Sequence, residues 1–219
     1  MKLHPHIPIF PLSLVLFPGA TLPLHIFEPR YKLMIRRCLS EHLPFGVILA
    51  SSKGIALVGT TAEIVQTIKE YPDGRMDILT MGQSVFSVKE LIDTKEYYEA
   101  VVEYPADSPQ AQSPLPAAAP PQSNDPLLQA ELVAQFNRCH ILLFGRPWSS
   151  PQESEDFPLS FTLAALLPLD LVVQQRLLEL RGERVRRDYL LECISRLLPE
   201  IAERQRIRRS VGGNGHPVN

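Results

Sequence analysis

The sequence predicts an α+β fold in which a strand-rich first part is followed by a helical second part. Apolar residues recur at a spacing close to two before position 104, and at the helical spacing of 3.6 after position 126. A stretch rich in proline and alanine separates the two patterns. We therefore expect a β subdomain at residues 1–104, a linker or loop at 105–125, a helical subdomain at 126–210 and a disordered tail at 211–219.

Short apolar runs in the first part have the length and composition of strands. Asp73-Gly74, between two of these runs, is a strong signal for a hairpin turn. Regularly spaced strands of this kind are typical of a barrel or a sandwich. The expected strands are Leu22–Phe27, Phe45–Ala50, Thr61–Ile68, Arg75–Met81, Ser84–Val88 and Tyr97–Tyr104.

One helix is embedded among these strands. Pro29 stands at a first-turn position, where its missing N–H costs nothing. The residues that follow place apolar side chains on one helical face, namely Tyr31, Met34, Ile35, Cys38 and Leu39.

Four segments of the second part predict helices. Asp170 is suited to be an N-cap, and Pro199 must kink or restart the last helix. The expected helices are Leu127–Phe144, Leu159–Leu167, Asp170–Leu180 and Glu183–Arg209, the last with Val185, Tyr189, Leu190, Ile194, Leu197 and Ile201 on one face.

The proline-rich stretch has the composition of a linker. Seven of the 21 prolines fall between Pro105 and Pro126, and Leu115 is the only large apolar residue among them. Such a stretch buries too little surface to offset the entropy lost when it becomes ordered. A semi-rigid exposed linker is therefore expected, with a long ordered loop packed on the first subdomain as the alternative.

Composition excludes several classes of protein. The formal net charge is −2, which disfavours a dedicated nucleic-acid binder. No apolar run reaches the ~20 residues that span a bilayer, and the start of the chain lacks the apolar core of a signal peptide. Cys38, Cys139 and Cys193 are an odd number of cysteines that lie far apart in the sequence, which indicates reduced thiols rather than disulfides or a zinc site. We expect a cytoplasmic protein without a membrane partner.

The near-matches to catalytic motifs each lack a required residue. A glycine pair beginning at Gly54 has the spacing of a phosphate-binding loop, but Thr60 stands where lysine is required, so a strand is expected. Ser84 lacks the second glycine of a nucleophile elbow. Cys139 and His140 point about 100° apart on a helix, which predicts a buried thiol beside an exposed imidazole rather than a catalytic pair.

The histidines lack the Cys pair or helical His pair of a zinc site. We expect His4, His6 and His25 to be exposed or to pair with other side chains. No catalytic, cofactor-binding or metal-binding residue is therefore expected.

The last expected helix is rich in arginine. Interleaved acidic residues predict a solvated helix face supported by i,i+4 ion pairs. The alternative is an anionic partner near Arg204–Arg209, where basic residues outnumber acidic ones.

The segments Ile7–Leu12, Val15–Gly19 and Leu22–Tyr31 form a long and specific pattern. This pattern closely resembles the amino-terminal substrate-binding domain of Lon proteases, and in particular its standalone bacterial form. Later segments also fit, so the resemblance covers most of residues 7–200, with the proline-rich stretch poorly matched. These later segments are Phe45–Val47, Val58–Ile64, Pro72–Arg75 and Leu159–Pro168.

The resemblance implies a PUA-like six-stranded β pseudo-barrel with an embedded helix, followed by a C-terminal α-helical bundle. It implies a non-enzymatic module, because the chain ends where the ATPase domain of a Lon protease would begin and has no room for the Ser-Lys protease domain. We expect protein or peptide clients, an adaptor role with a protease or chaperone in protein quality control, and no cofactor. The alternative is an RNA-binding PUA-like protein, by analogy of fold alone. The sequence leaves open whether the chain forms a homo-oligomer.

The resemblance brings no catalytic residue with it. Its signature positions are fold-defining candidates and a candidate binding surface: Phe17, Pro18, Gly19, Pro23, Phe27, Glu28, Pro29, Arg30 and Tyr31. Glu28 and Arg30 are expected to form an ion pair at the start of the embedded helix.

Overall fold

The computed structural model describes residues 5–52, 54–93, 96–105, 125–149 and 157–212, with the side chains of 209–212 left out. The chain forms two compact units. The sheet unit contains six strands and the helices α1, α3 and α4, and the helix unit contains α2 and α5. Most of the expected linker and part of the expected tail lie outside the described residues, so both stay predictions.

Six strands form one mixed sheet, which confirms the expected α+β class. Each segment expected as a strand between residues 22 and 104 overlaps an observed strand, and an additional strand precedes them at His6–Leu12. The strands are β1 (His6–Leu12), β2 (Thr21–Ile26), β3 (Phe45–Ser51), β4 (Gly54–Glu70), β5 (Met76–Ile92) and β6 (Glu99–Glu103).

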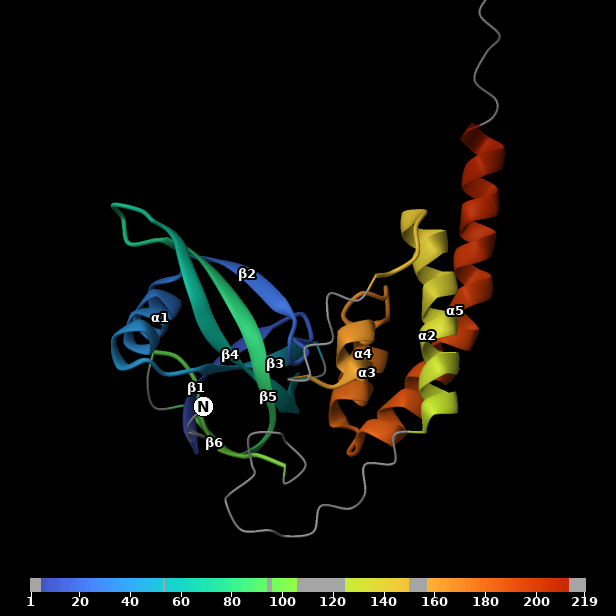
Figure 1. The fold of residues 1–219 in the computed structure, drawn as a ribbon. Coiled ribbons are helices and arrows are strands. Elements are labelled where there is room, and N and C mark those ends of the chain that lie inside the picture. The colour runs from blue at the N-terminus through green and yellow to red at the C-terminus, as the bar shows by residue number, and fades with distance from the viewer. Residues whose placement is uncertain (1–4, 53, 94–95, 106–124, 150–156, 213–219) are drawn as a thin grey trace, which may run out of the picture. The chain divides into compact units, whose positions relative to one another are not determined.

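The pairing of the strands closes five of them into a ring (Figure 1). β1 runs parallel to β3, and the pairs β3–β4, β4–β5, β5–β6 and β6–β1 are antiparallel. β2 is the sixth strand. It pairs with Met76–Met81 of β5, whereas β6 pairs with Ser87–Ile92 further along β5. Among the described strands, β2 is therefore the end strand of the order β2-β5-β4-β3-β1-β6.

The turn between β4 and β5 confirms the hairpin signal. Gly74 has a φ of 79°, a conformation that favours glycine, and its N–H donates to the carbonyl of Tyr71 over 2.8 Å. The expectation of two strands at 75–81 and 84–88 was wrong, because β5 runs unbroken through Gly82. The N–H of Gly82 donates to the carbonyl of Ala20 over 2.9 Å, which continues the register of β2 on β5, while the pairing of β5 with β4 shifts by one residue between Gly82 and Val85.

Helix α1 (Pro29–Glu41) packs on the sheet through the face that its spacing predicts. Tyr31, Met34, Ile35 and Cys38 are buried in one cluster with strand residues that include Phe45. Burial raises the pKa of the Cys38 thiol to about 12. A second buried cluster of the sheet includes Phe86 and Ile9.

A buried carboxylate connects α1 to the sheet. Glu99 in β6 is only 2% exposed, and its Oε1 accepts a 2.5 Å hydrogen bond from Nη1 of Arg37. His6 Nε2 lies 2.9 Å from the other oxygen. His6 thus pairs with a side chain, as expected, but with an acidic partner that its sequence neighbours do not reveal.

Helices α3 (Leu159–Ala164) and α4 (Leu171–Glu179) belong to the sheet unit, although they follow the proline-rich stretch in the sequence. Gln175 fixes α4 on the sheet, since its Nε2 donates to the carbonyl of Val58 in β4 over 3.1 Å. α3 is shorter than expected: its last residues form tight turns, and Pro168 has no N–H with which to continue it. Asp170 is the N-cap of α4, as expected, but its side chain makes no capping hydrogen bond.

The helix unit consists of α2 (Pro126–Phe144) and α5 (Glu183–Gly212), which lie side by side and run in the same direction (Figure 1). Arg187 donates to the side chain of Gln129 near their starts, and Gln205 donates to the carbonyl of Leu142 near their ends. α5 continues through Pro199 as one helix. The buried side chains of this unit include Leu132, Phe136, Cys139, Leu190, Ile194 and Ile201.

The prediction of the buried face of α5 was wrong at one residue, Val185. Val185 is 49% exposed, whereas the neighbouring Arg186 and Arg187 are each only 8% exposed. The physical reason is Glu183, whose carboxylate accepts from Nε of Arg186 over 3.2 Å and from Nε of Arg187 over 2.9 Å. Paired guanidinium groups can be buried where a lone one would not.

Candidate functional site

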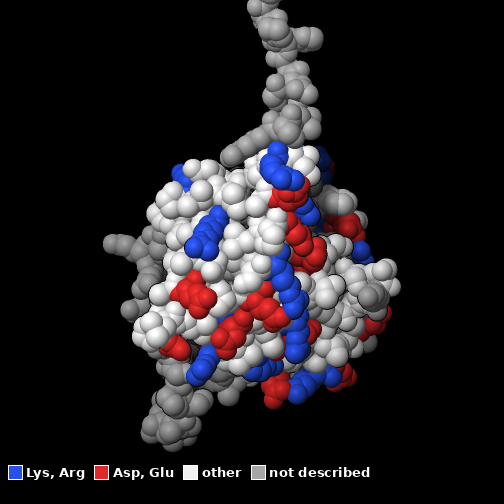
Figure 2. Space-filling model, turned by 90° about the vertical axis from the view of Figure 1, so that its right-hand side faces the viewer, with Lys and Arg blue, Asp and Glu red and all other residues white. Residues whose placement is uncertain are grey.

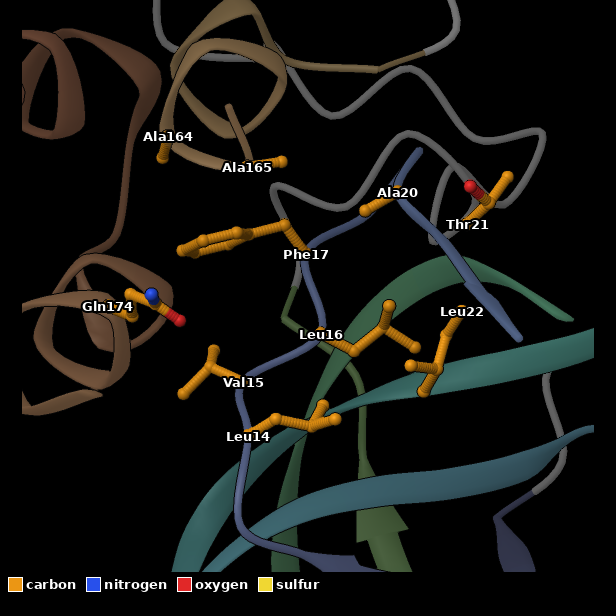
Figure 3. Close-up of a pocket in the computed structure, with 10 residues that line it drawn as sticks. All are labelled: Leu14, Val15, Leu16, Phe17, Ala20, Thr21, Leu22, Ala164, Ala165 and Gln174. Carbon is orange, nitrogen blue, oxygen red and sulfur yellow. The ribbon is translucent and has the colours of Figure 1, made fainter. Parts of the chain in front are cut away.

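An apolar pocket of about 190 Å³ lies beside the start of β2 (Figure 3). One wall is the connection between β1 and β2 together with the first residues of β2, and the other wall comes from the end of α3 and from α4. Its lining residues, called the apolar pocket below, are Leu14, Val15, Leu16, Phe17, Ala20, Thr21, Leu22, Ala164, Ala165 and Gln174.

The side chains of the loop wall divide their roles between the core and the pocket. Leu16 is buried in the cluster shared with α1, and Leu22 packs against that cluster from β2. Val15 and Phe17 point instead toward the helices (Figure 3). Phe17 is only 2% exposed, and its ring stacks on that of Phe161 in α3 with 5.5 Å between centroids. This stack joins the two walls.

Gly19 lets the loop turn into β2. Its φ is 81°, and its N–H donates to the carbonyl of Gly82 over 2.8 Å. A Cβ on Gly19 would come within 2.9 Å of the Phe157 ring, so a side chain there meets both backbone strain and a clash. Pro18, beside it, is buried. These two signature residues therefore shape the loop that carries the pocket wall.

Polar atoms form a substantial part of the pocket surface beside the apolar side chains. Gln174 contributes the amide group of α4, and its Nε2 donates to the carbonyl of Leu169 over 2.7 Å. Thr21, on the other wall, is exposed at the start of β2. Eight of the ten lining residues are apolar, so the pocket can hold an apolar side chain of a ligand while its polar groups orient that ligand.

The other signature residues gather where β2 leads into α1. The carboxylate of Glu28 accepts from Nε of Arg30 over 2.9 Å, which confirms the expected ion pair. The Arg30 guanidinium also lies over the Tyr31 ring, 4.6 Å from its centroid. Pro29 occupies the first turn of α1, as predicted. Because both Glu28 and Arg30 are substantially exposed, the pair fixes the helix start only weakly.

Phe27 is a large apolar signature residue that is open to solvent, with 59% of its surface exposed. Its ring stacks on that of His25, with 6.0 Å between centroids. His25 Nδ1 lies 2.6 Å from Oδ1 of Asp77, and the Tyr71 hydroxyl donates to Oδ2 of Asp77 over 2.9 Å. The hydrogen bond with His25, followed by that from Tyr71, lowers the pKa of the Asp77 carboxyl. This small network orients the rings of His25, Phe27 and Tyr71 at the end of β2, which are called the exposed aromatic cluster below.

The structure thus divides the predicted residues. Phe17 lines the apolar pocket, Pro18 and Gly19 shape its loop, Pro23 lies in β2, and the residues from Phe27 to Tyr31 form the corner after β2. Sequence reasoning missed Ala164, Ala165 and Gln174, which come from helices about 140 residues further along the chain. Short side chains in an ordinary helical pattern give no signal that they line a pocket.

The thiol beside His140 is not arranged for catalysis. Cys139 is fully buried, and burial raises its pKa to about 11. His140 is half-buried rather than exposed, because its ring lies between those of Phe136 and Phe144. Within the described ranges, no three His, Cys, Asp or Glu side chains are grouped to hold a metal ion, and no helix there has the length and apolarity to cross a membrane.

The charged face of α5 agrees with the solvated-face interpretation. Arg196 pairs with Glu192, Arg204 pairs with Glu200 over 3.8 Å, and a further pair joins residues 206 and 203. Figure 2 shows basic and acidic side chains interspersed rather than gathered into a patch of one sign. The RNA-binding alternative gains no support from this surface, because phosphate contacts need a concentration of positive charge.

Comparison with known proteins agrees with this geometry. The family model described as the ATP-dependent protease La (LON) substrate-binding domain matches residues 6–196. The chain is 28% identical to the Lon protease of Escherichia coli (strain K12) over 222 residues, which is 94% of this chain and 26% of that protein. It is 31% identical to the Lon protease of Parabacteroides distasonis over 105 residues, which is 44% of this chain and 13% of that protein. The chain spans about a quarter or less of these relatives.

Solved structures lead to the same family. The crystal structure of a Lon N-terminal domain protein from Xanthomonas campestris is 25% identical, with a TM-score of 0.61 over 85% of this chain and 97% of that one. The N-terminal domain of a Mycobacterium avium complex Lon protease shares the fold at 16% identity, with a TM-score of 0.57 over 87% of this chain and 98% of that one. The chain therefore belongs to the family of ATP-dependent protease La (LON) substrate-binding domains.

Proposed function

We propose that this chain is a non-catalytic protein-binding module of the cytoplasm, which recognises exposed apolar segments of client proteins and acts as an adaptor for a protease or chaperone. The observation that carries the proposal is the apolar pocket between the β1–β2 connection and the helices α3 and α4. Its loop wall is built from residues of the family signature, including Phe17. Unfolded proteins expose apolar side chains that folded proteins bury, so such a pocket selects for them.

The size of the pocket fits one client side chain. A volume of about 190 Å³ exceeds the roughly 150 Å³ of an engineered apolar cavity that accepts benzene. One leucine or phenylalanine side chain therefore fits, while a charged side chain would lose its hydration against Val15, Phe17 and the α3 alanines. The proposed specificity is for uncharged apolar residues rather than for one client sequence.

The test measures how tightly the full chain binds a permanently unfolded protein. Fluorescently labelled, reduced and carboxymethylated α-lactalbumin is titrated with the parent chain, and fluorescence anisotropy reports binding. Ala165→Glu places a charge at the pocket from an exposed position, and Ala202→Glu makes the same change on the exposed surface of α5. We expect at least ten-fold weaker binding for Ala165→Glu and parental binding for Ala202→Glu. Equal binding by both variants, or none by the parent chain, would overturn the proposal.

A further inference from the structure

We propose that a client segment binds as an extended strand along the outer edge of β2 and places one side chain in the apolar pocket. This inference rests on the proposed function and adds the way in which the client backbone is held. Its starting point is the position of β2 at the end of the strand order, where the described residues supply no strand on its outer side. An edge strand offers a row of unpaired backbone donors and acceptors.

The register of β2 on β5 identifies which backbone groups face outward. The carbonyl of Ala20 faces β5, because it accepts from the N–H of Gly82. Backbone direction alternates along a strand, so Leu22 and Leu24 also face β5, and the hydroxyl of Thr80 indeed donates to the carbonyl of Leu22 over 2.8 Å. Thr21, Pro23 and His25 therefore direct their backbone groups away from the sheet.

These outward groups are chemically specific for another backbone. They comprise the N–H groups of Thr21 and His25 and the carbonyls of Thr21, Pro23 and His25. Pro23, which has no N–H, falls at an outward position, the only kind at which an edge strand tolerates proline without losing a ladder hydrogen bond. Only an extended segment presents donors and acceptors at the matching two-residue spacing.

The edge is continuous with the apolar pocket at one end and with the exposed aromatic cluster at the other. Thr21 and Leu22 belong to both β2 and the pocket lining. Phe27, just beyond the last residue of β2, is exposed beside His25. Phe27 lies six positions after Thr21, a span of about 20 Å in an extended chain. A client segment of six or seven residues would therefore reach both, with backbone hydrogen bonds between them.

The occupant that fits is a short segment of an unfolded chain rather than a second folded copy. Pro23 leaves a missing donor in the middle of the edge, and such an interruption disfavours the long uniform pairing of two sheet edges. A flexible peptide adjusts around one missing hydrogen bond, because its own backbone is not fixed in a sheet.

The experiment follows backbone amides of the full chain by NMR-detected hydrogen exchange. The probe is a twelve-residue peptide of alternating leucine and threonine between terminal lysines. Its matched control carries N-methyl groups on alternate residues, which keeps the side chains but removes donors along one edge. We expect the amides of Thr21 and His25 to become at least ten-fold slower in exchange on binding, while those of Leu22 and Leu24 change little. The N-methylated peptide should bind at least ten-fold more weakly.

Each other result overturns the inference in a distinguishable way. Equal binding of both peptides, with Thr21 and His25 unchanged, would reject strand addition while leaving the pocket proposal to the Ala165→Glu comparison. Protection of the two amides that rises with protein concentration alone would assign the edge to a second copy. Failure of the unmodified peptide to bind, with parental binding of carboxymethylated α-lactalbumin intact, would also reject it.

Discussion

The segment from Leu14 to Leu22 and the helix α5 both reach the surface, but they differ in how far their side chains already find partners within the chain. Charged side chains of α5 form ion pairs with one another, such as Arg196 with Glu192. The apolar side chains of the Leu14–Leu22 segment are only partly buried, because Leu14, Val15 and Leu22 stay half-exposed around the apolar pocket. A surface whose groups are already paired has little to gain from a partner, whereas a half-buried apolar pocket gains from covering.

The largest effect should come from removing the side chain that joins the two walls of the pocket. Phe17→Ala deletes a ring that is buried and stacked on Phe161. We expect a loss of about 3–5 kcal/mol in the free energy of unfolding, the usual range for a buried phenylalanine. Urea denaturation measures it, with Phe144→Ala as the control, since Phe144 is 58% exposed. A loss below about 1 kcal/mol for Phe17→Ala would mean that the stack does not hold the pocket wall.

The next effect tests whether the charges of α5 belong to its fold. Glu183→Gln removes the carboxylate that Arg186 and Arg187 share, and both guanidinium groups are nearly buried. We expect a loss of about 2 kcal/mol or more, because hydrogen bonds to charged groups are strong and the remaining charges lose their partner.

Glu192→Gln is the matched control for that change, since its partner Arg196 is exposed. It should cost only about 0.3–0.5 kcal/mol, as exposed i,i+4 pairs do. Thermal unfolding of the two variants gives the comparison. Weaker client binding by either stably folded variant would show that α5 takes part in recognition and would break the contrast between the two regions.

A smaller effect is expected at the corner that follows β2. Arg30→Ala removes an exposed ion pair with Glu28 and a contact with Tyr31, so the free energy of unfolding should fall by about 1 kcal/mol or less. Binding of carboxymethylated α-lactalbumin should stay parental. If the variant is as stable as the parent chain yet binds the client more weakly, Arg30 is a contact residue and the binding surface extends around the corner.

The smallest effect concerns pH. The pKa of Asp77 is lowered in the folded chain by its hydrogen bonds with His25 and Tyr71. A lowered folded pKa means that the stabilisation is complete above the ordinary Asp value of about 3.9 and is lost as the pH falls through the folded value. Asp77→Asn should therefore unfold with a shallower pH dependence below about pH 4. An unchanged acid-unfolding profile would show that the network contributes nothing to stability.

Local signals predicted the local structure of this chain well. The Asp73-Gly74 turn and the α1 face that carries Met34 depend on neighbours within a few residues, and both were confirmed. Non-local packing was harder to predict. Gly82 looks like a break between two strands, yet pairing with the β1–β2 connection keeps β5 continuous. Arg186 and Arg187 look solvent-exposed, but a shared carboxylate buries them at the expense of Val185.

The pocket itself shows the same limit. Its loop wall was within reach of sequence reasoning, because Phe17 belongs to a specific apolar pattern. Its helix wall was not, because Ala165 and Gln174 become neighbours of that loop only when α3 and α4 pack with the sheet unit. The apolar pattern of a helix does not predict which distant loop the helix will pack against.

Methyl NMR on the full chain tests the central claim most directly, namely that clients bind at the apolar pocket. The methyl groups of Val15 and Leu22 report on the pocket, and those of Val185 and Ile207 report on the exposed surface of α5. On titration with unlabelled carboxymethylated α-lactalbumin, we expect the Val15 and Leu22 signals to shift or broaden while the α5 signals stay in place. Changes confined to Val185 and Ile207 would contradict the account.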